Sequence, residues 1–164
     1  MVERIPMERR GHAIADVDVV RFEERIGATL PSEYRRFLLT VNGGRPALET
    51  SVITLGRSET VINTLNSLDD EDEDRDLFSL YEWGLEASGL PTPDLLQIGS
   101  CTHGPVALCI RGAQYGEVWV LDTGDPRPED ANPRVLWHDR RDMHRIATSF
   151  GEFIASLRPD QPAI

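Results

Sequence analysis

The strongest structural signals of this chain lie in one stretch, Gly27-Ala-Thr-Leu-Pro-Ser-Glu-Tyr-Arg-Arg-Phe-Leu-Leu-Thr-Val-Asn-Gly-Gly44. Leu30-Pro31 predicts the start of a helix, because the first turn is where the missing N–H of proline costs least. Apolar residues then recur at i, i+3, i+4 and i+7, the spacing of one buried helix face: Tyr34, Phe37, Leu38 and Val41. Asn42-Gly43-Gly44 predicts its end, since glycine readily adopts the left-handed conformation that closes a helix.

A second amphipathic helix is expected just before this stretch. Asp16 or Asp18 can cap its start, Gly27 can end it, and three apolar residues lie along one side: Val19, Phe22 and Ile26. A connection of three to four residues between two such helices favours near-antiparallel packing or a sharp corner. Both apolar faces should therefore turn toward one core.

The rest of the chain reads as short strands and further helices. Apolar, β-branched runs bounded by turn residues predict strands at 51–55, 95–99, 106–110, 117–122 and 134–138. Apolar residues at helical spacing predict helices at 58–68, 77–87 and 142–157. Residues 1–15 read as an N-terminal lead-in, 16–157 as the one domain and 158–164 as a short C-terminal tail.

The charge balance excludes several classes of partner. The net charge is −11, from 28 acidic and 17 basic residues, and every basic residue is Arg. Such a field repels nucleic acid and anionic membrane surfaces and attracts a basic protein. No apolar run approaches the roughly 20 residues needed to cross a bilayer, and the N-terminus carries no secretory pattern. We therefore expect a cytoplasmic protein that binds neither nucleic acid nor membrane.

Seven acids and one Arg crowd into eight consecutive positions: Asp69, Asp70, Glu71, Asp72, Glu73, Asp74, Arg75 and Asp76. This density should repel itself and stay extended in water as a loop. The run reads either as a solvated loop or as a docking surface for a cationic partner. Trp83 lies off the apolar stripe of the helix at 77–87, so it is the tryptophan most expected to be exposed. The expected partner-binding residues are these seven acids and Trp83.

A calcium loop is an alternative interpretation of the acidic run. Asp70, Asp72 and Asp74 alternate as the first three ligands of an EF-hand do. The remaining positions fail, because Arg75 stands where the turn needs Gly and Tyr81 where a bidentate Glu belongs. We therefore expect no metal there.

The two cysteines give no clear site either. Cys101, His103 and Cys109 could join His138 or His144 around zinc, but the chain lacks the compact ligand pairs of structural zinc sites. Two buried, reduced thiols are the ordinary expectation, with a disulfide between neighbouring strands as the alternative. The chain also has neither a Gly-x-Ser-x-Gly elbow nor Walker spacing, so we expect no catalytic residue and no cofactor.

Several segments, taken in order, resemble the SUKH superfamily. They are the first helix, Leu30–Tyr34, Asn42–Gly44, Leu96–Gly99 with Gly104, Gly116–Asp122, and Ser149–Ile154. The resemblance spans residues 16–157 and implies a single α+β domain with a mixed or mostly antiparallel sheet of about six strands packed against several helices. The order of elements read from the residues agrees with that fold. The acidic run lies in the variable middle of the family pattern and matches no motif.

The resemblance also implies a function, because the superfamily includes many bacterial toxin-immunity proteins and a yeast regulator of cell-wall synthesis. The first expectation is an immunity protein, not an enzyme, that binds and neutralises a cognate polymorphic toxin stoichiometrically. Nuclease toxins fit such an acidic partner, since a groove that attracts phosphate is basic. The alternative is a regulatory or scaffold domain that recruits other proteins.

Overall fold

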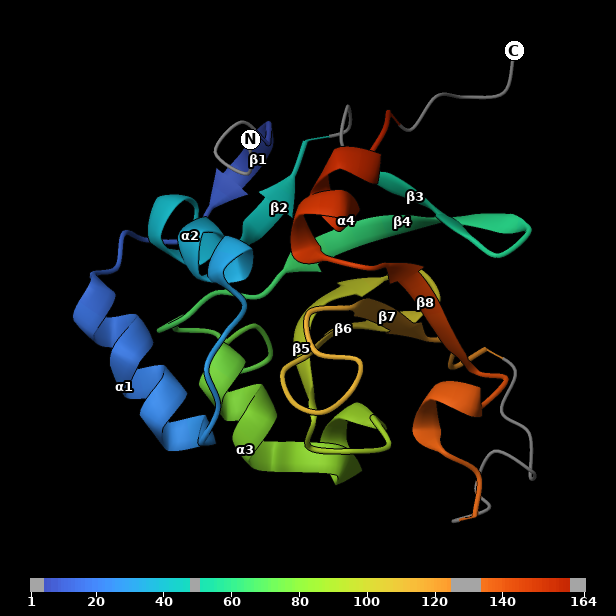
Figure 1. Ribbon diagram of the computed structural model, residues 1–164. Coiled ribbons are helices and arrows are strands. Elements are labelled where there is room, and N and C mark those ends of the chain that lie inside the picture. Colours follow the sequence, from blue (N-terminus) through green and yellow to red (C-terminus); the bar gives the residue numbers. More distant parts are fainter. Residues whose placement is uncertain (1–4, 48–50, 125–133, 160–164) are drawn as a thin grey trace.

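In the computed structural model, which describes residues 5–47, 51–124 and 134–159, a curved antiparallel sheet of eight strands packs against four α-helices (Figure 1). The strand order is β1-β2-β4-β5-β6-β7-β8, and β3 pairs with β4. The strands are β1 Met7–Arg10, β2 Gly44–Pro46, β3 Val52–Leu55, β4 Ser58–Leu65, β5 Leu95–Cys101, β6 Gly104–Cys109, β7 Val118–Leu121 and β8 Met143–Ala147. The expected α+β class is confirmed, with more strands than the expected six.

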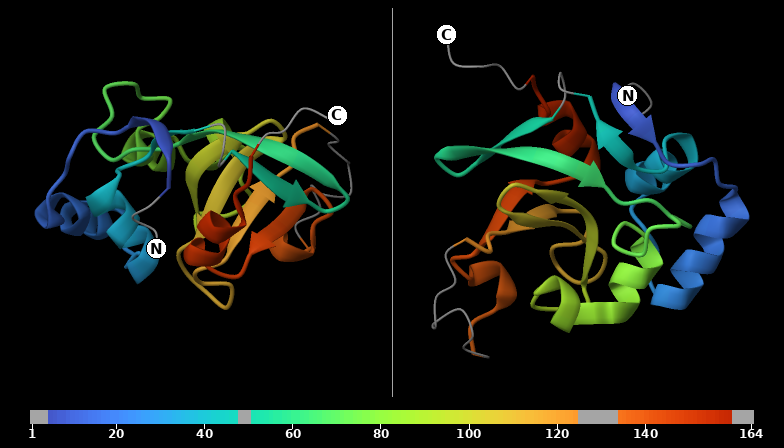
Figure 2. Two further views of the ribbon diagram at one scale, coloured as in Figure 1. Left: turned by 90° about the horizontal axis from the view of Figure 1, so that it is seen from above. Right: turned by 180° about the vertical axis from the view of Figure 1, so that it is seen from behind.

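The helices are α1 Asp16–Ile26, α2 Ser32–Thr40, α3 Leu77–Ser88 and α4 Phe150–Ser156, and η4 is a 3-10 turn at Trp137–Asp139. Helix α1 packs against α2, α2 against α4, α3 against β5, and α4 against β8. The sheet curves strongly enough to bring β3 close to β8 (Figure 2). No helix in the described ranges is long and apolar enough to cross a membrane.

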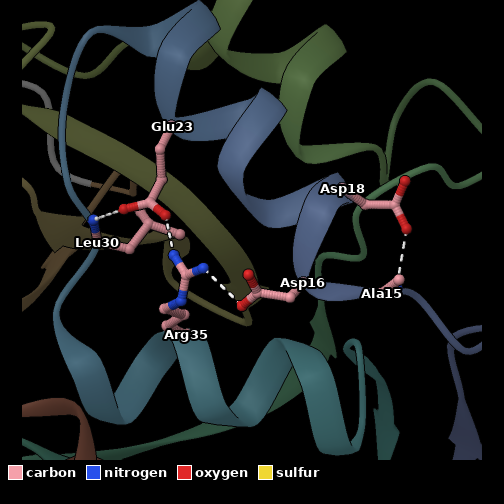
Figure 3. Close-up of polar contacts among 6 residues, drawn as sticks. All are labelled: Ala15, Asp16, Asp18, Glu23, Leu30 and Arg35. Atoms are coloured by element: carbon pink, nitrogen blue, oxygen red, sulfur yellow. Dashed lines mark hydrogen bonds and ion pairs between the residues drawn. The ribbon is translucent and has the colours of Figure 1, made fainter.

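The predicted pair α1–α2 is confirmed. Gly27 ends α1 with a φ of 65°. The residue at the cap position is Ala15, not Asp16 or Asp18 as expected, and Asp18 in the first turn accepts a hydrogen bond from the Ala15 N–H. Between the helices, the Glu23 carboxylate accepts from the Leu30 N–H at 2.9 Å and from Arg35 (Figure 3). Arg35 also bonds Asp16, which is the main reason its pKa is raised. This network fixes the turn between the two apolar faces.

The main core lies between the helices and the sheet. The apolar face of α2 meets α4 through an aromatic cluster, with ring centroids 5.0 Å apart for Tyr34–Phe150 and for Phe37–Phe150. All three rings are almost completely buried. A smaller cluster forms where Trp119 and Trp137 meet edge to face, with their centroids 4.9 Å apart.

The predicted helix at 58–68 is wrong, because this segment is mainly strand β4. It pairs with β3 in a hairpin whose two-residue turn is Gly56-Arg57, and Gly56 has a φ of 60°. Thr60, Ile62 and Leu65 are buried along the strand. The β-branched residues of this segment therefore follow their strand preference.

The predictions near the C-terminus also need correction. The predicted strand at 134–138 is an irregular segment ending in η4, and the fourth strand of the meander is β8 instead, paired with β7. The predicted helix at 142–157 is confirmed only from Phe150 onward. Its true start is marked by Ser149, whose hydroxyl accepts a hydrogen bond from the Glu152 N–H.

The segments flanking the predicted domain take part in the sheet where the structure describes them. Within the lead-in, β1 pairs with β2, and a hypothetical Cβ on Gly44 would lie 2.0 Å from the Arg9 carbonyl oxygen. The strands can approach this closely only because residue 44 is glycine. At the other end, Arg158 bridges to Val52. Residues 1–4 of the lead-in and 160–164 of the tail lie outside the described residues.

Candidate functional site

The acidic run forms a closed loop between β4 and α3. We call residues 68–75 the acidic loop. Its ends are joined at a neck, where the Ser67 N–H donates to the Arg75 carbonyl at 3.0 Å and the Leu77 N–H donates to the Ser67 carbonyl at 2.9 Å. A loop of this length with adjacent ends has the form of an Ω-loop. The loop itself was expected, but the prediction that charge repulsion keeps it extended is wrong.

Part of the negative charge holds the loop in shape. The Asp72 N–H donates to the Asp70 carboxylate at 2.9 Å, and the Asp74 N–H donates to the Asp72 carboxylate at 3.0 Å. The Arg75 guanidinium lies 3.2 Å from the Asp72 carboxylate and balances one charge inside the loop. Short-range Asx hydrogen bonds and this ion pair therefore offset the repulsion that favours an extended chain.

Asp76, the residue directly after the acidic loop, has a structural role. It is 8% exposed, and one carboxylate oxygen accepts from the N–H and hydroxyl of Ser79, each at 2.9 Å, at the start of α3. Its other oxygen accepts from the Asp70 N–H at 3.1 Å. A carboxylate at this position caps the helix and complements its dipole. This geometry gives Asp76 no free surface for a partner, unlike the other acids of the run.

Four acids remain free at the surface. They are Asp69, Glu71, Glu73 and Asp74, all exposed and all without a side-chain hydrogen bond or ion pair to any residue that the structure describes. They share one short loop whose main chain is fixed at the neck and by Asx bonds. The loop therefore presents a dense, ordered set of uncommitted carboxylates.

Asn42, expected from the sequence only to end a helix, anchors this loop. Asn42 is buried, with 1% exposure and a φ of 52°. Its side-chain amide donates to the Leu68 and His12 carbonyls at 3.0 and 2.8 Å, and its side-chain oxygen accepts from the Leu68 N–H at 2.8 Å. Asn42 thus ties the end of α2 to the root of the acidic loop.

Trp83 lies on α3, away from the start of the helix where the acidic loop ends. Its side chain is 41% exposed, and it lies seven residues beyond Asp76, about 10 Å along α3 at 1.5 Å per residue. Helix α3 is kinked at Gly84, which has a φ of 67°. Trp83 is therefore an exposed aromatic residue on α3, and it takes no part in the hydrogen bonds described for the acidic loop.

The described residues form neither a metal site nor a disulfide. Among the residues described, no three His, Cys, Asp or Glu side chains form a group that could hold a metal ion. Cys101 and Cys109 are free and buried. Their strand partners, Gly104 and Leu95, set them at opposite ends of the β5–β6 hairpin, about 20 Å apart. The disulfide alternative is therefore wrong, and burial raises the pKa of the Cys109 thiol.

The order of these elements agrees with a known family over most of the chain. Residues 13–156 match the SMI1 / KNR4 family (SUKH-1). The protein belongs to this family. The matched range runs from just before α1 to the last residue of α4, and so includes the acidic loop and the Asn42 anchor. SUKH-1 proteins include immunity proteins and cell-wall regulators. No curated protein matches the chain.

Proposed function

We propose that this SUKH-1 protein is a cytoplasmic immunity protein that binds a basic cognate toxin domain and neutralises it stoichiometrically. The observation that carries the proposal is the acidic loop, which holds four uncommitted carboxylates on a fixed main chain. A preordered loop loses little conformational entropy on binding, and its charge accelerates encounter with a basic surface. Family membership supports a role in binding other proteins.

A nuclease domain is the toxin class that suits this surface best. Its substrate groove must be basic to hold phosphate, so an acidic inhibitor can occupy the groove directly. Inhibition then needs only occupancy, with no catalytic residue in the immunity protein. Trp83 is proposed as an additional aromatic contact, because exposed tryptophan side chains are enriched among residues that dominate binding energy.

Co-expression with the product of the neighbouring gene tests the proposal. The expected result is rescue of growth together with co-purification of a one-to-one complex. A neighbouring product that kills the cells whether or not the immunity protein is present contradicts the proposal. A gel of the same cells must show that both proteins are expressed, because an immunity protein that is not made cannot protect.

A regulatory scaffold is the second candidate, because the family also includes cell-wall regulators. The same acidic loop would then recruit several partners with weaker affinity. Affinity purification from the native host distinguishes the two functions. A single stoichiometric partner supports immunity, whereas several substoichiometric partners without any protection from killing support the scaffold.

A further inference from the structure

The acidic loop forms one wall of a surface groove that continues over the first strands. Two adjoining hollows, of about 820 and 720 Å³, share Arg9, Thr64 and Arg75 in their linings. The first lies between the acidic loop and residues 9–12, and the second extends over β1, β2 and β4. In the view from above, β1 and the loop between β4 and α3 lie on the same side of the domain (Figure 2). The shared lining joins the hollows into one groove.

The two walls of the groove carry opposite charge. Asp69 and Glu71 line it from the acidic loop. Arg9 and Arg10 line it from β1, and both are exposed, with no side-chain hydrogen bond or ion pair to any residue in the described ranges. His12, two residues after Arg10, also lines the groove. Residues with uncommitted positive and negative charge thus line one hollow, and no ion pair joins Arg9 or Arg10 to Asp69 or Glu71.

The remaining cations of the groove are already neutralised. Arg45 lies 3.4 Å from the Glu8 carboxylate, and Arg75 lies 3.2 Å from the Asp72 carboxylate. Among the described residues that line the groove, Arg9 and Arg10 are therefore the arginines whose charge no carboxylate balances. This leaves a concentrated positive site on a chain whose net charge is −11.

The lining and the neighbouring strand indicate the kind of occupant. Polar residues such as Asn63 and Thr64 line the groove, whereas sites for small molecules are mostly apolar. A phosphate polymer lying along Arg9 and Arg10 would meet the carboxylates of the opposite wall. Strand β1 is at the edge of the sheet and pairs only with β2 among the described residues, and edge strands commonly dock extended segments of partner proteins.

We propose that the groove receives an extended segment of the toxin that carries both signs of charge. Basic side chains of that segment lie against Asp69 and Glu71, and acidic side chains lie against Arg9 and Arg10. This inference rests on the proposed function and adds to it a positive contact site that net charge alone would not suggest. It also gives specificity, because a uniformly basic protein would be repelled by the two arginines.

The test compares two charge-reversed variants with the co-purified toxin domain as the probe. Arg9→Glu/Arg10→Glu should weaken the complex at least about tenfold in Kd by calorimetry. Arg36→Glu/Arg57→Glu makes the same change in charge at two exposed arginines outside the groove, and should change Kd less than about twofold. Arg9→Lys/Arg10→Lys keeps the charge and should retain most of the affinity. Urea midpoints of all variants report on folding.

Hydrogen exchange of the unsubstituted complex provides a second measurement that needs no variant. The main-chain amides of β1 should become protected when the toxin domain binds. Unchanged exchange in β1, together with an unchanged Kd for Arg9→Glu/Arg10→Glu, would overturn the groove proposal while growth rescue still upheld immunity. If the unsubstituted protein neither rescues growth nor binds the toxin domain, the proposed function is rejected, and the groove proposal with it.

A labelled single-stranded oligonucleotide tests the competing class of occupant. Fluorescence polarisation should show no binding by the unsubstituted protein at physiological salt. Binding that disappears in Arg9→Glu/Arg10→Glu would assign the arginine wall to phosphate, and would overturn the proposal of a protein segment.

Discussion

Asn42 and Leu68 exchange two hydrogen bonds, because the Asn42 side-chain amide donates to the Leu68 carbonyl at 3.0 Å and its oxygen accepts from the Leu68 N–H at 2.8 Å. The pair is buried and joins residues 26 positions apart in the chain. One end is the Asn-Gly-Gly motif that closes α2, and the other is the first residue of the acidic loop. The motif that helps define the fold therefore also places the proposed contact surface.

Replacing Asn42 should destabilise the protein and loosen the loop. Asn42→Gly keeps the left-handed backbone but leaves the Leu68 main chain and the His12 carbonyl without partners, so unfolding in urea should show a loss of about 2–4 kcal/mol. Asn63→Ala, at an exposed position in β4, serves as control and should cost less than about 1 kcal/mol. A cost for Asn42→Gly no larger than that of the control would contradict the anchoring role.

Glu23 should be the acid on α1 that matters most for stability. Its side chain is 12% exposed and supports the α1–α2 turn through Leu30 and Arg35 (Figure 3). Glu23→Ala leaves the Leu30 N–H without its partner and the Arg35 guanidinium with Asp16 alone, and should cost about 2 kcal/mol by chemical denaturation. Glu24→Ala, its exposed neighbour, should stay within about 0.5 kcal/mol of the parent. Equal costs for the two variants would refute the role of the turn network.

Tyr34 carries a buried hydroxyl with no hydrogen-bond partner among the residues that the structure describes. The residue is 1% exposed. Burial raises the pKa of the phenol above its ordinary value, because the charged form is not solvated. Tyr34→Phe should therefore leave stability unchanged or raise it by up to about 1 kcal/mol, whereas Tyr34→Ala should lose about 3–5 kcal/mol. Clear destabilisation by Tyr34→Phe would show that the hydroxyl has a partner.

The start of α4 should give stability a measurable pH dependence. Glu152 accepts hydrogen bonds from the hydroxyl and N–H of Thr148, and these bonds lower its pKa below the ordinary 4.5. A lowered pKa in the folded state means that the ionised form stabilises the fold above pH 4.5, and that this contribution is lost as the pH falls through the folded-state pKa. Glu152→Gln should thus be less stable than the parent at pH 7 and similar to it at about pH 3. A difference that persists unchanged at low pH would contradict this origin.

Elements whose sequence signals agreed could be predicted, and those with competing signals could not. In α1 and α2, capping residues, apolar spacing and glycine stops all indicate the same boundaries. At 58–65, apolar spacing suggested a helix, but the pairing of β4 with β3 across Gly56-Arg57 outweighed it. At 143–147, apolar spacing continues the stripe of α4 upstream, yet Ser149 with Glu152 three residues later marks the helix start and leaves β8 outside it.

The candidate site was predictable in composition but not in detail. The sequence identified the acidic run, while its closed form depends on Asn42 and on the Ser67–Leu77 neck, which are tertiary contacts. Asp76 could have been recognised as a helix cap, because it directly precedes the apolar spacing of α3. Arg9 and Arg10 carried no sequence signal, since their relation to the loop arises only when β1 joins the sheet.

The rate of association with the co-purified toxin domain tests the central claim most directly. Glu71→Gln/Glu73→Gln removes two uncommitted charges from the acidic loop, and Glu24→Gln/Glu59→Gln removes two exposed charges elsewhere. We predict that the loop variant associates at least about threefold more slowly at low salt, with a flatter dependence on ionic strength, while the control keeps the parent rate to within about a factor of two. Association of the loop variant at the parent rate, with the parent salt dependence, would contradict the claim that the acidic loop recruits the toxin.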